Sequence, residues 1–440
     1  MLDKLLKFCF VATVLFLFFI SGFLSYKFKL NHIYTNFNHA IQLFENYIDI
    51  NLYNKFGDRE QRNKLNNIKN TSDNNFNFYD KPHLEFENYL LIKHDHSQTV
   101  LMSSPDKVEW TWDLSNFRNY SKIMPLHLYS NGDLIIGNFE NKGIYRIDKN
   151  GKIIWKSNRI SHHWIDIYDD MLFIPSRKFV NLPTGIKNNL LKKSSLGKCK
   201  IKNSSFDSIL ILDSHSGEVR SEINLIENLS NNNEFINILN ENYKLNNEIC
   251  KDPLHLNDIQ VVDIKTKIIL DKFLPNISKG DLILSFRSIN SIIFYDHLNK
   301  KIKHIVYNLF DKQHSPRVHE DGHLYVFDNN PGGANSKIVK INILTNTISS
   351  TFEDIKFKSD VKGRIQFLDN KLFVQSSTQG EVFQIICDEI FFENCLSKYL
   401  YSSNFSYFYP SNMFDSSEIF KKDAIYIADF YKKDYVKFLD

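Results

Sequence analysis

Three segments in the second half of the chain carry the residues best suited to chemistry. They are CKDPLHLNDIQ around His255, DLILSFRSIN around Arg287 and QHSPRVHEDGHLYVFDNN around His314. Each sets a histidine or an arginine beside alternating apolar residues, which is the pattern of a β-strand. A fourth segment, RISHHWIDIY, adds His162 and His163. We therefore expect imidazoles and a guanidinium from separate strand ends to meet in one shallow site.

These residue types suit an oxyanion such as a sulfate or phosphate ester. A guanidinium binds two oxygens at once through its planar fork, and imidazoles add charge-assisted hydrogen bonds. A neutral imidazole can also attack the central atom of the ester. The sequence has no G-x-x-x-x-G-K-[ST] loop that would hold a nucleotide donor. The residues thus predict group transfer that needs no nucleotide, metal or other cofactor.

Short strands and turns recur from about Leu84 onward and predict an all-β architecture. Asn131-Gly132 and Asn150-Gly151 are strong hairpin signals, and they indicate three antiparallel strands in succession. A strand, an Asx or Gly turn, a strand ending in Asp and another turn then return several times, as in a propeller blade. Sandwiches contain similar strands, but the number of repeats favours one large propeller. A late strand within residues 424–431 is expected to close the ring.

Residues 224–247 are polar and helical in pattern, and are expected to form an insertion over one face of the propeller. Cys199 and Cys250 bracket this insertion, while Cys387 and Cys395 share the short loop CDEIFFENC. The short loop makes Cys387 with Cys395 the easiest disulfide, which leaves Cys199 to pair with Cys250. Neither pair has the CxxC spacing of a zinc ribbon, so both pairs are expected to be structural.

Residues 1–29 predict a transmembrane anchor. The stretch 8–26 carries no charge and has the length that a helix needs to cross a bilayer. Lysines flank it on both sides, so orientation rests on the usual behaviour of a first apolar segment, which places the C-terminal part outside the cytoplasm. A cleaved signal peptide is the alternative, although the stretch is long for one and lacks an A-x-A site. Residues 30–83 read as a short amphipathic helix, at about 35–55, and a polar linker.

The HLND segment, the S-x-R segment and the QH segment followed by DG and FDNN resemble the bacterial arylsulfotransferase family. The resemblance covers most of the chain after the linker and is weaker in the HH pair and the NGDLIIG strand. It implies a six-bladed β-propeller that moves a sulfuryl group between phenols through a sulfated histidine. By this resemblance His314 is the nucleophile, His255 and Arg287 bind sulfate, and either His162 or His163 is the fourth member of the site.

Two neighbouring segments leave their roles open. Asp258 either holds His255 in one tautomer or closes an Asx turn. The FDNN run either orients His314 or caps a strand end, and capping is favoured slightly. His94 and His96 lie between early strands and are expected to be turn residues rather than metal ligands.

We predict a sulfotransferase that uses an aryl sulfate ester, not a nucleotide sulfate, as the donor and a phenolic or other small molecule as the acceptor. The alternative is a non-catalytic propeller that binds sulfated or anionic ligands, or an envelope assembly platform. A metal enzyme using the same histidines is disfavoured because acidic companions are few and Arg287 would repel a cation. The propeller, residues 84–440, is expected to face the periplasm from a single-pass anchor in a bacterial inner membrane.

The charge of the chain says little about further partners. A formal net charge of +3 over 440 residues is small, and no Lys/Arg block is interleaved with aromatic residues. Nucleic-acid binding is therefore not expected. The oligomeric state stays open.

Overall fold

The computed structural model describes most of the chain from residue 86 onward, within the second of two compact units, His83–Asp440. The described ranges are 86–93, 98–104, 107–117, 123–138, 142–182, 184, 188–245, 247–353, 358–368, 371–378, 380–386, 396–402 and 428–439. The expected membrane anchor, amphipathic helix and linker, His94, His96 and the Cys387–Cys395 pair lie outside these ranges. Within them, no helix is long and apolar enough to cross a membrane.

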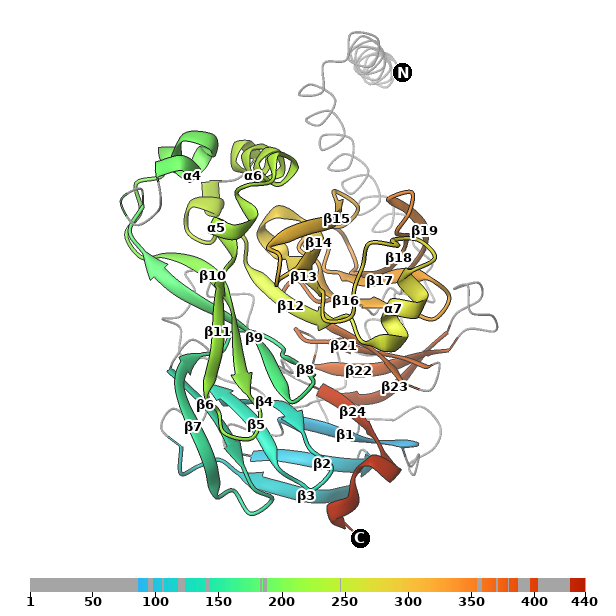
Figure 1. Cartoon of the computed structure of the whole chain (residues 1–440). Helices are drawn as coiled ribbons and strands as arrows, with labels where there is room; N and C mark the ends of the chain where they lie inside the picture. Colours follow the sequence, from blue (N-terminus) through green and yellow to red (C-terminus); the bar gives the residue numbers. More distant parts are fainter. Residues whose placement is uncertain are drawn as a thin grey trace, which may run out of the picture. The chain divides into compact units, whose positions relative to one another are not determined.

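Six four-stranded antiparallel sheets form the blades of a β-propeller (Figure 1). Blade 1 consists of β1 (Asn88–Lys93), β2 (Gln98–Ser104), β3 (Lys107–Asp113) and β24 (Ala428–Lys432). Blade 2 consists of β4 (Ile123–Leu128), β5 (Leu134–Asn138), β6 (Lys142–Ile147) and β7 (Ile153–Ile160). Blade 3 consists of β8 (Asp166–Tyr168), β9 (Met171–Val180), β10 (Ser204–Asp213) and β11 (Val219–Asn224).

Blades 4 to 6 follow in chain order. Blade 4 consists of β12 (Leu256–Val261), β13 (Leu282–Phe286), β14 (Ser291–Asp296) and β15 (Lys301–Tyr307). Blade 5 consists of β16 (His314–Val318), β17 (His323–Asp328), β18 (Lys337–Asn342) and β19 (Thr347–Phe352). Blade 6 consists of β20 (Arg364–Leu368), β21 (Lys371–Ser376), β22 (Glu381–Ile386) and β23 (Leu396–Ser402).

The end of the chain closes the ring. The inner strands β8, β12, β16, β20 and β24 contact one another in turn from blade to blade. β24 supplies the inner strand of blade 1 and pairs antiparallel with β1, with Asp429 opposite Leu91. Closure by a late strand is confirmed, and it removes the free sheet edges that would otherwise invite aggregation.

The two predicted hairpins form, between β4 and β5 and between β6 and β7. Gly132 and Gly151 adopt φ of 89° and 83°. A Cβ at Gly132 would lie 2.8 Å from the Phe438 ring, so both the backbone and the space require glycine. The expectation of three strands in this region was wrong, because four strands make a full blade. The connection between β5 and β6 carries no Asn-Gly pair, and so gave no comparable turn signal.

Apolar side chains between neighbouring blades form the core. Between blades 4 and 5, Ile283 and Phe294 pack with Leu324 and Val326, and all four side chains are fully buried. Every residue of β14 is buried, since both faces of a blade pack against neighbours. This explains why several strands appear in the sequence as continuous apolar runs instead of strict alternation.

Helices interrupt blade 3 and the connection to blade 4. α4 (Asn188–Lys193) and the 3-10 helix η2 (Ser195–Lys198) precede β10, while α5 (Leu225–Leu229), α6 (Asn233–Leu245) and η3 (Asn247–Cys250) follow β11 (Figure 1). The expected helical insertion thus contains α5 and α6, whereas α4 and η2 were not anticipated. A disulfide joins Cys199 to Cys250, as predicted, with the two Cα atoms 5.6 Å apart.

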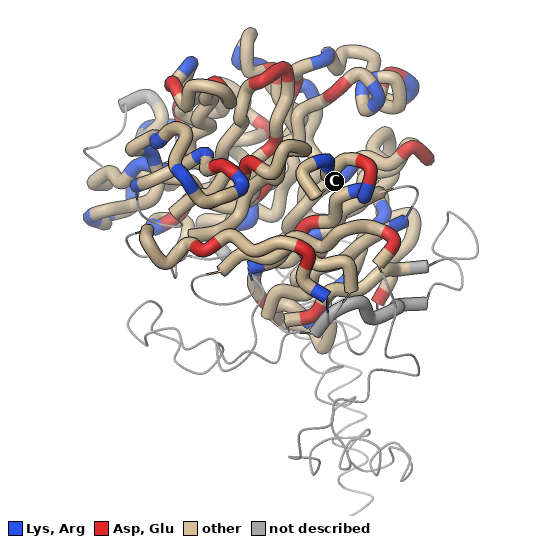
Figure 2. Tube along the Cα trace, turned by 90° about the horizontal axis from the view of Figure 1, so that it is seen from below, with Lys and Arg blue, Asp and Glu red and all other residues tan. Residues whose placement is uncertain are grey.

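The remaining short helices are α7 (Ile264–Leu270), η4 (Arg287–Ile289), η5 (Lys433–Tyr435) and η6 (Lys437–Leu439). Phe438 in η6 packs on Trp110 and Trp112, with ring centroids 5.4 and 5.9 Å away, and so fastens the end of the chain to blade 1. Cationic and anionic residues occur together along the described trace (Figure 2).

Candidate functional site

The candidate residues come from the starts of the inner strands. Each blade is a four-stranded meander, so successive inner strands run in the same direction and their first residues face one end of the ring centre. His162 and His163 precede β8, His255 precedes β12, and His314 is the first residue of β16. Arg287 follows β13, whose end pairs with the start of β12. Propeller geometry therefore brings together residues that are far apart in the sequence.

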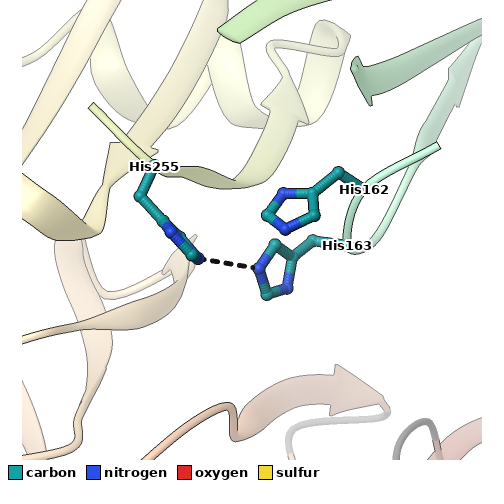
Figure 3. Close-up of side chains that lie close together, drawn as sticks. All are labelled: His162, His163 and His255. Atoms are coloured by element: carbon teal, nitrogen blue, oxygen red, sulfur yellow. Dashed lines mark hydrogen bonds between the residues drawn. The ribbon is translucent and has the colours of Figure 1, made fainter. Parts of the chain in front are cut away.

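Four imidazoles form one group, called here the histidine cluster: His162, His163, His255 and His314. The Nε2 atoms of His163 and His255 lie 3.1 Å apart, at hydrogen-bonding distance (Figure 3). The His162 ring centroid is 4.1 Å from that of His163 and 5.1 Å from that of His255. The His314 centroid lies 5.6 Å from that of His163. Both members of the HH pair thus reach the cluster.

Asp252 fixes the tautomer of His255. Its Oδ2 lies 2.6 Å from His255 Nδ1, so the imidazole N–H donates to the carboxylate. In neutral His255 the lone pair is then on Nε2, and His163 Nε2–H donates to it. The Asp252 carboxylate and the imidazoles of His255 and His163 therefore form a chain of hydrogen bonds, in which each N–H donates toward Asp252.

Asn329 fixes the tautomer of His314. Its Nδ2 donates to the backbone oxygens of Ser359, at 2.6 Å, and Lys362. The amide orientation is therefore set, and Oδ1 must face His314 Nδ1, 2.6 Å away. Nδ1–H also points to the Lys312 backbone oxygen at 3.1 Å. The proton of neutral His314 is thus on Nδ1, and the lone pair is on Nε2.

The structure rejects both alternatives for Asp258 and divides the two roles of the FDNN run between Asn329 and Asp328. Asp258 neither holds His255 nor closes a turn, because its carboxylate binds Arg317 through two hydrogen bonds of 2.9 and 3.2 Å. In the FDNN run, Asn329 orients His314, contrary to the favoured capping role. Capping does hold for Asp328, whose Oδ1 accepts from the backbone N–H groups of Asp311 and Asn330.

Arg287 contributes positive charge to the site. Its backbone N–H donates to the His255 backbone oxygen at 3.1 Å, which places η4 beside the histidine cluster. Burial lowers the pKa of His314 well below its ordinary value, and the charge of Arg287 lowers it further. The guanidinium therefore acts electrostatically on the imidazole with the free Nε2.

Burial keeps the cluster neutral at pH 7. It lowers the pKa of His162 and His163 well below the ordinary value, and neighbouring cationic and imidazole groups add to the effect. Burial also lowers the pKa of His255, although the Asp252 carboxylate opposes that shift. Neutral imidazoles can act as nucleophiles, and any of them that gains a proton becomes a strong hydrogen-bond donor to an anion.

The backbone is strained where the two facing imidazoles are attached. His163 and His255 adopt φ of 69° and 55°, in the left-handed region. A non-glycine residue held in such a conformation costs about 1–3 kcal/mol, and this strain is common at functional sites. The surrounding fold therefore fixes both side chains in directions that an unstrained strand start would not give.

Trp164 connects the cluster to a buried ion pair. Its ring centroid lies 5.9 Å from that of His163 and 6.5 Å from that of His314. The Arg364 guanidinium carbon lies 5.4 Å from the indole centroid, and Arg364 donates to Asp429 at 2.9 Å. An aromatic side chain thus packs directly against the candidate nucleophile.

Three imidazoles of the cluster meet a spacing criterion for a metal ion. Nitrogen atoms of His162, His163 and His255 lie within 4.8 Å of one another. Two positive charges, on Arg177 and Arg287, act on His255. The Asp252 carboxylate opposes both charges at His255, whereas Arg287 is the largest charge that acts on His314, where it favours an anionic ligand.

Comparison with known proteins agrees with this chemistry. Residues 190–390 match the family model described as Arylsulfotransferase (ASST). Over this segment the chain is similar to the arylsulfotransferase family. The arylsulfotransferase match includes His255, Arg287 and His314, whereas His162 and His163 precede it. Among curated proteins, none matches the chain.

Two solved structures are among those similar to this chain. One is a protein of unknown function from Bacteroides caccae, with a TM-score of 0.38 and 11% identity, covering 72% of this chain and 97% of that one. The other is the Dos1 propeller, with a TM-score of 0.36 and 12% identity, covering 68% of this chain and 70% of that one.

Sequence reasoning missed Asp252, Asp207 and Arg177 around the site. Asp252 carried a usable signal, because an acidic residue three positions before a candidate histidine can reach its imidazole when the chain turns back. Asp207 and Arg177 carried none. They lie on β10 and β9, and only the strand register places them near the histidine cluster.

Proposed function

We propose that this protein transfers a sulfuryl group from an aryl sulfate ester to His314 and then to a phenolic acceptor. The family match supports the class of reaction. The observation that carries the proposal is the tautomer of His314, whose Nδ1–H donates to Asn329 while Nε2 keeps its lone pair. A nucleophile held in this way beside a guanidinium suits attack on an anionic ester.

In the first half-reaction, His314 Nε2 attacks the sulfur atom. The N–S bond forms as the bond between sulfur and the aryl oxygen breaks, and the phenolate leaves with the bonding electrons. Because Nδ1 keeps its proton, the sulfated imidazole is cationic and is a good leaving group for the second step. The lowered pKa of His314, caused mainly by burial, keeps the free imidazole neutral and ready to attack.

The departing phenolate needs a proton. We assign this proton to the hydrogen-bonded pair of His163 and His255. Binding of the anionic ester adds a negative charge, which favours uptake of one proton from solvent by the pair, and Asp252 stabilises the resulting cation through Nδ1 of His255. The pair gives this proton to the phenolate, and a later acceptor phenol returns one as its oxygen attacks sulfur.

We assign to Arg287 the role of binding the sulfuryl oxygens. Sulfuryl transfer passes through a loose anionic arrangement, so donors held in place before reaction stabilise it without reorganising. The planar guanidinium fork contacts two oxygens at once. Its charge already lowers the pKa of His314 in the free protein, which supports a place for the guanidinium at the anionic ester.

We further propose that the propeller is exported and anchored to the inner membrane, facing the periplasm. Support comes from the uncharged stretch 8–26 and from the Cys199–Cys250 disulfide, which suits an oxidising compartment. Retention of the full chain in membranes after alkaline extraction, with the propeller accessible to protease only from the periplasmic side, is the expected result. Release into the soluble fraction would favour a cleaved signal peptide.

A chromogenic aryl sulfate with a phenol acceptor tests the transfer. Wild-type protein given donor alone should gain the mass of one sulfuryl group, and should lose it when the phenol is added. His314→Asn should abolish both the adduct and the turnover. His319→Asn is the matched control, since His319 is buried in the same blade but lies outside the histidine cluster. If wild-type protein binds the ester but shows neither adduct nor turnover, the enzyme proposal is wrong and the protein is a non-catalytic binding module.

A further inference from the structure

A second carboxyl lies behind His255. Asp252 uses Oδ2 to accept from His255 Nδ1, but its Oδ1 is buried without a hydrogen-bond partner among the described residues. Asp207 is 2% exposed, and within the same part of the chain neither of its oxygens has a hydrogen bond of regular geometry, although the backbone N–H groups of Leu256 and His255 point toward its carboxyl. Buried carboxylate oxygens without donors are costly, so a proton on one of these groups is expected to supply the missing donor.

The start of β10 places Asp207 near Asp252. The Ser205 backbone N–H donates to the Lys251 backbone oxygen at 2.7 Å, and the Ser204 hydroxyl donates to the Cys250 oxygen at 2.8 Å. The segment that leads to Asp252 therefore runs beside the strand that carries Asp207. The Cys199–Cys250 disulfide holds this arrangement two residues from Asp252.

The charged and polar groups that face Asp207 come from two segments, the start of β12 with the loop before it and strand β9. Asp252 faces it from the loop before β12, and the backbone amides of His255 and Leu256 face it from the same segment. Arg177 faces it from β9, where it is the direct cross-strand partner of Asp207. The Arg177 Nε and Nη2 atoms are buried without hydrogen-bond partners in the described structure, so no bonded ion pair neutralises Asp207.

We propose that Asp207 is a positioning residue of the transfer site: its protonated carboxyl donates to Asp252 Oδ1 and thereby keeps Asp252 bound to His255. This inference rests on the proposed function, because it concerns the imidazole pair that exchanges the proton. Asp207 touches no substrate and acts through Asp252. The series Asp207, Asp252, His255 and His163 then forms one chain of hydrogen bonds.

The pKa values of Asp207 and Asp252 are shifted in opposite directions, as this arrangement requires. Burial, together with the charge of Asp252, raises the pKa of Asp207 to about 7, against the opposing effects of Arg177 and the backbone amides of Leu256 and His255. Burial would also raise the pKa of Asp252, but the charge and hydrogen bond of His255 outweigh it and lower that pKa. One carboxyl therefore holds a proton where the other is ionised, which is how paired carboxyls divide their roles.

This pairing makes transfer sensitive to pH. As the pH rises through about 7, Asp207 loses its proton and two buried carboxylates face each other. Their repulsion weakens the contact of Asp252 with His255, and the proton exchange with the phenol slows. An asparagine at position 207 keeps an N–H donor for Asp252 and does not ionise.

The pH profile of kcat/KM tests the inference with full-length protein. Wild type should lose activity above about pH 7, and Asp207→Asn should move this alkaline limb up by about one pH unit or more. Asp207→Ala should instead lower kcat at every pH. Asp166→Asn is the matched control, because Asp166 lies in the same blade and burial raises its pKa too, and its profile should follow wild type. A profile of Asp207→Asn that superimposes on that of wild type would overturn the inference.

An infrared measurement keeps the inference independent of turnover. A difference spectrum between wild type and Asp207→Asn at about pH 6, without substrate, should show the band of one protonated carboxyl, and the band should fade by about pH 8. If wild-type protein shows this band but no transfer activity, the proposed function is wrong, whereas the protonated carboxyl of Asp207 is confirmed. Absence of the band would overturn the inference even if transfer is observed.

Discussion

His163 and His255 join Nε2 to Nε2 at 3.1 Å although they belong to segments 92 residues apart. One lies before the inner strand of blade 3 and the other before the inner strand of blade 4. Asp252 sets which nitrogen of His255 carries the proton, and this decides the direction of donation between the rings. Packing of neighbouring blades thus produces a hydrogen-bonded pair of imidazoles beside His314.

Replacing Asn329 should impair both fold and transfer. Asn329→Ala leaves His314 Nδ1 and the Ser359 and Lys362 carbonyls without their partner, at about 1–3 kcal/mol for each buried group. We expect a lower Tm, and kcat lower by about 10- to 100-fold with little change in KM. Asn329→Asp keeps an acceptor for His314, so its kcat should exceed that of the alanine variant at equal folded fraction. Equal kcat in the two variants would contradict the tautomer argument.

Substituting Arg287 with Lys should weaken binding and transfer together. The charge remains, but the fork that binds two oxygens is lost, at about 1.5–3 kcal/mol for a charged hydrogen bond. We expect kcat/KM to fall by about 10- to 100-fold, measured by steady-state kinetics with a range of aryl sulfates. Arg220→Lys, at a largely exposed arginine of β11, is the control. Unchanged kinetics in Arg287→Lys would remove this residue from the site.

The histidine cluster should make the protein less stable in acid. Burial lowers the pKa of His162, His163 and His314, whereas an unfolded histidine titrates near its ordinary value. The unfolded state therefore binds more protons below about pH 6.5, and each group removes up to about 1.4 kcal/mol per pH unit. The raised pKa values of four carboxyls act in the opposite sense: Asp166, Asp207, Asp328 and Asp429. The lowered pKa values of His127, His255 and His297 add to the effect of the other three histidines, so six histidines oppose four carboxyls. The Tm should fall between about pH 6.5 and 5.5, and His163→Asn should reduce the slope.

Loss of the Cys199–Cys250 disulfide should loosen the site. The bond closes a loop with a sequence separation of 51 residues, and its removal is expected to cost about 2–4 kcal/mol. Since Cys250 lies two residues before Asp252, the double alanine variant should lose kcat as well as Tm. Thiol labelling of denatured, non-reduced protein should modify Cys9 alone if Cys387 and Cys395 are also paired. Labelling of all five cysteines would contradict export.

A chelator distinguishes the proposed anion site from a metal site. The charge of Arg287 favours an anion at His314, and the charges of Arg287 and Arg177 oppose the Asp252 carboxylate at His255. Dialysis against EDTA should therefore leave the rate of sulfuryl transfer unchanged, as measured with the chromogenic donor. A loss of rate that returns on adding one metal ion would favour a metal centre at His162, His163 and His255.

The sequence alone determined the class of fold and was enough to select candidate site residues that the structure brings together. Recurring strands, Asn-Gly turns and a late closing strand follow from local backbone preferences and apolar periodicity, which act over a few residues and can be seen in the chain. Histidine and arginine at strand ends can be identified for the same reason. His255, Arg287 and His314 could therefore be selected before their positions in space were known.

Only the tertiary structure decided which partners these residues have. Asp258 looked like the partner of His255 because it is close in sequence, but the strand directs its carboxylate to Arg317. Asp252 takes that place because the left-handed backbone at His255 turns the imidazole back toward it. Hydrogen bonds between blades depend on strand register and side-chain direction, and a short window of sequence contains neither.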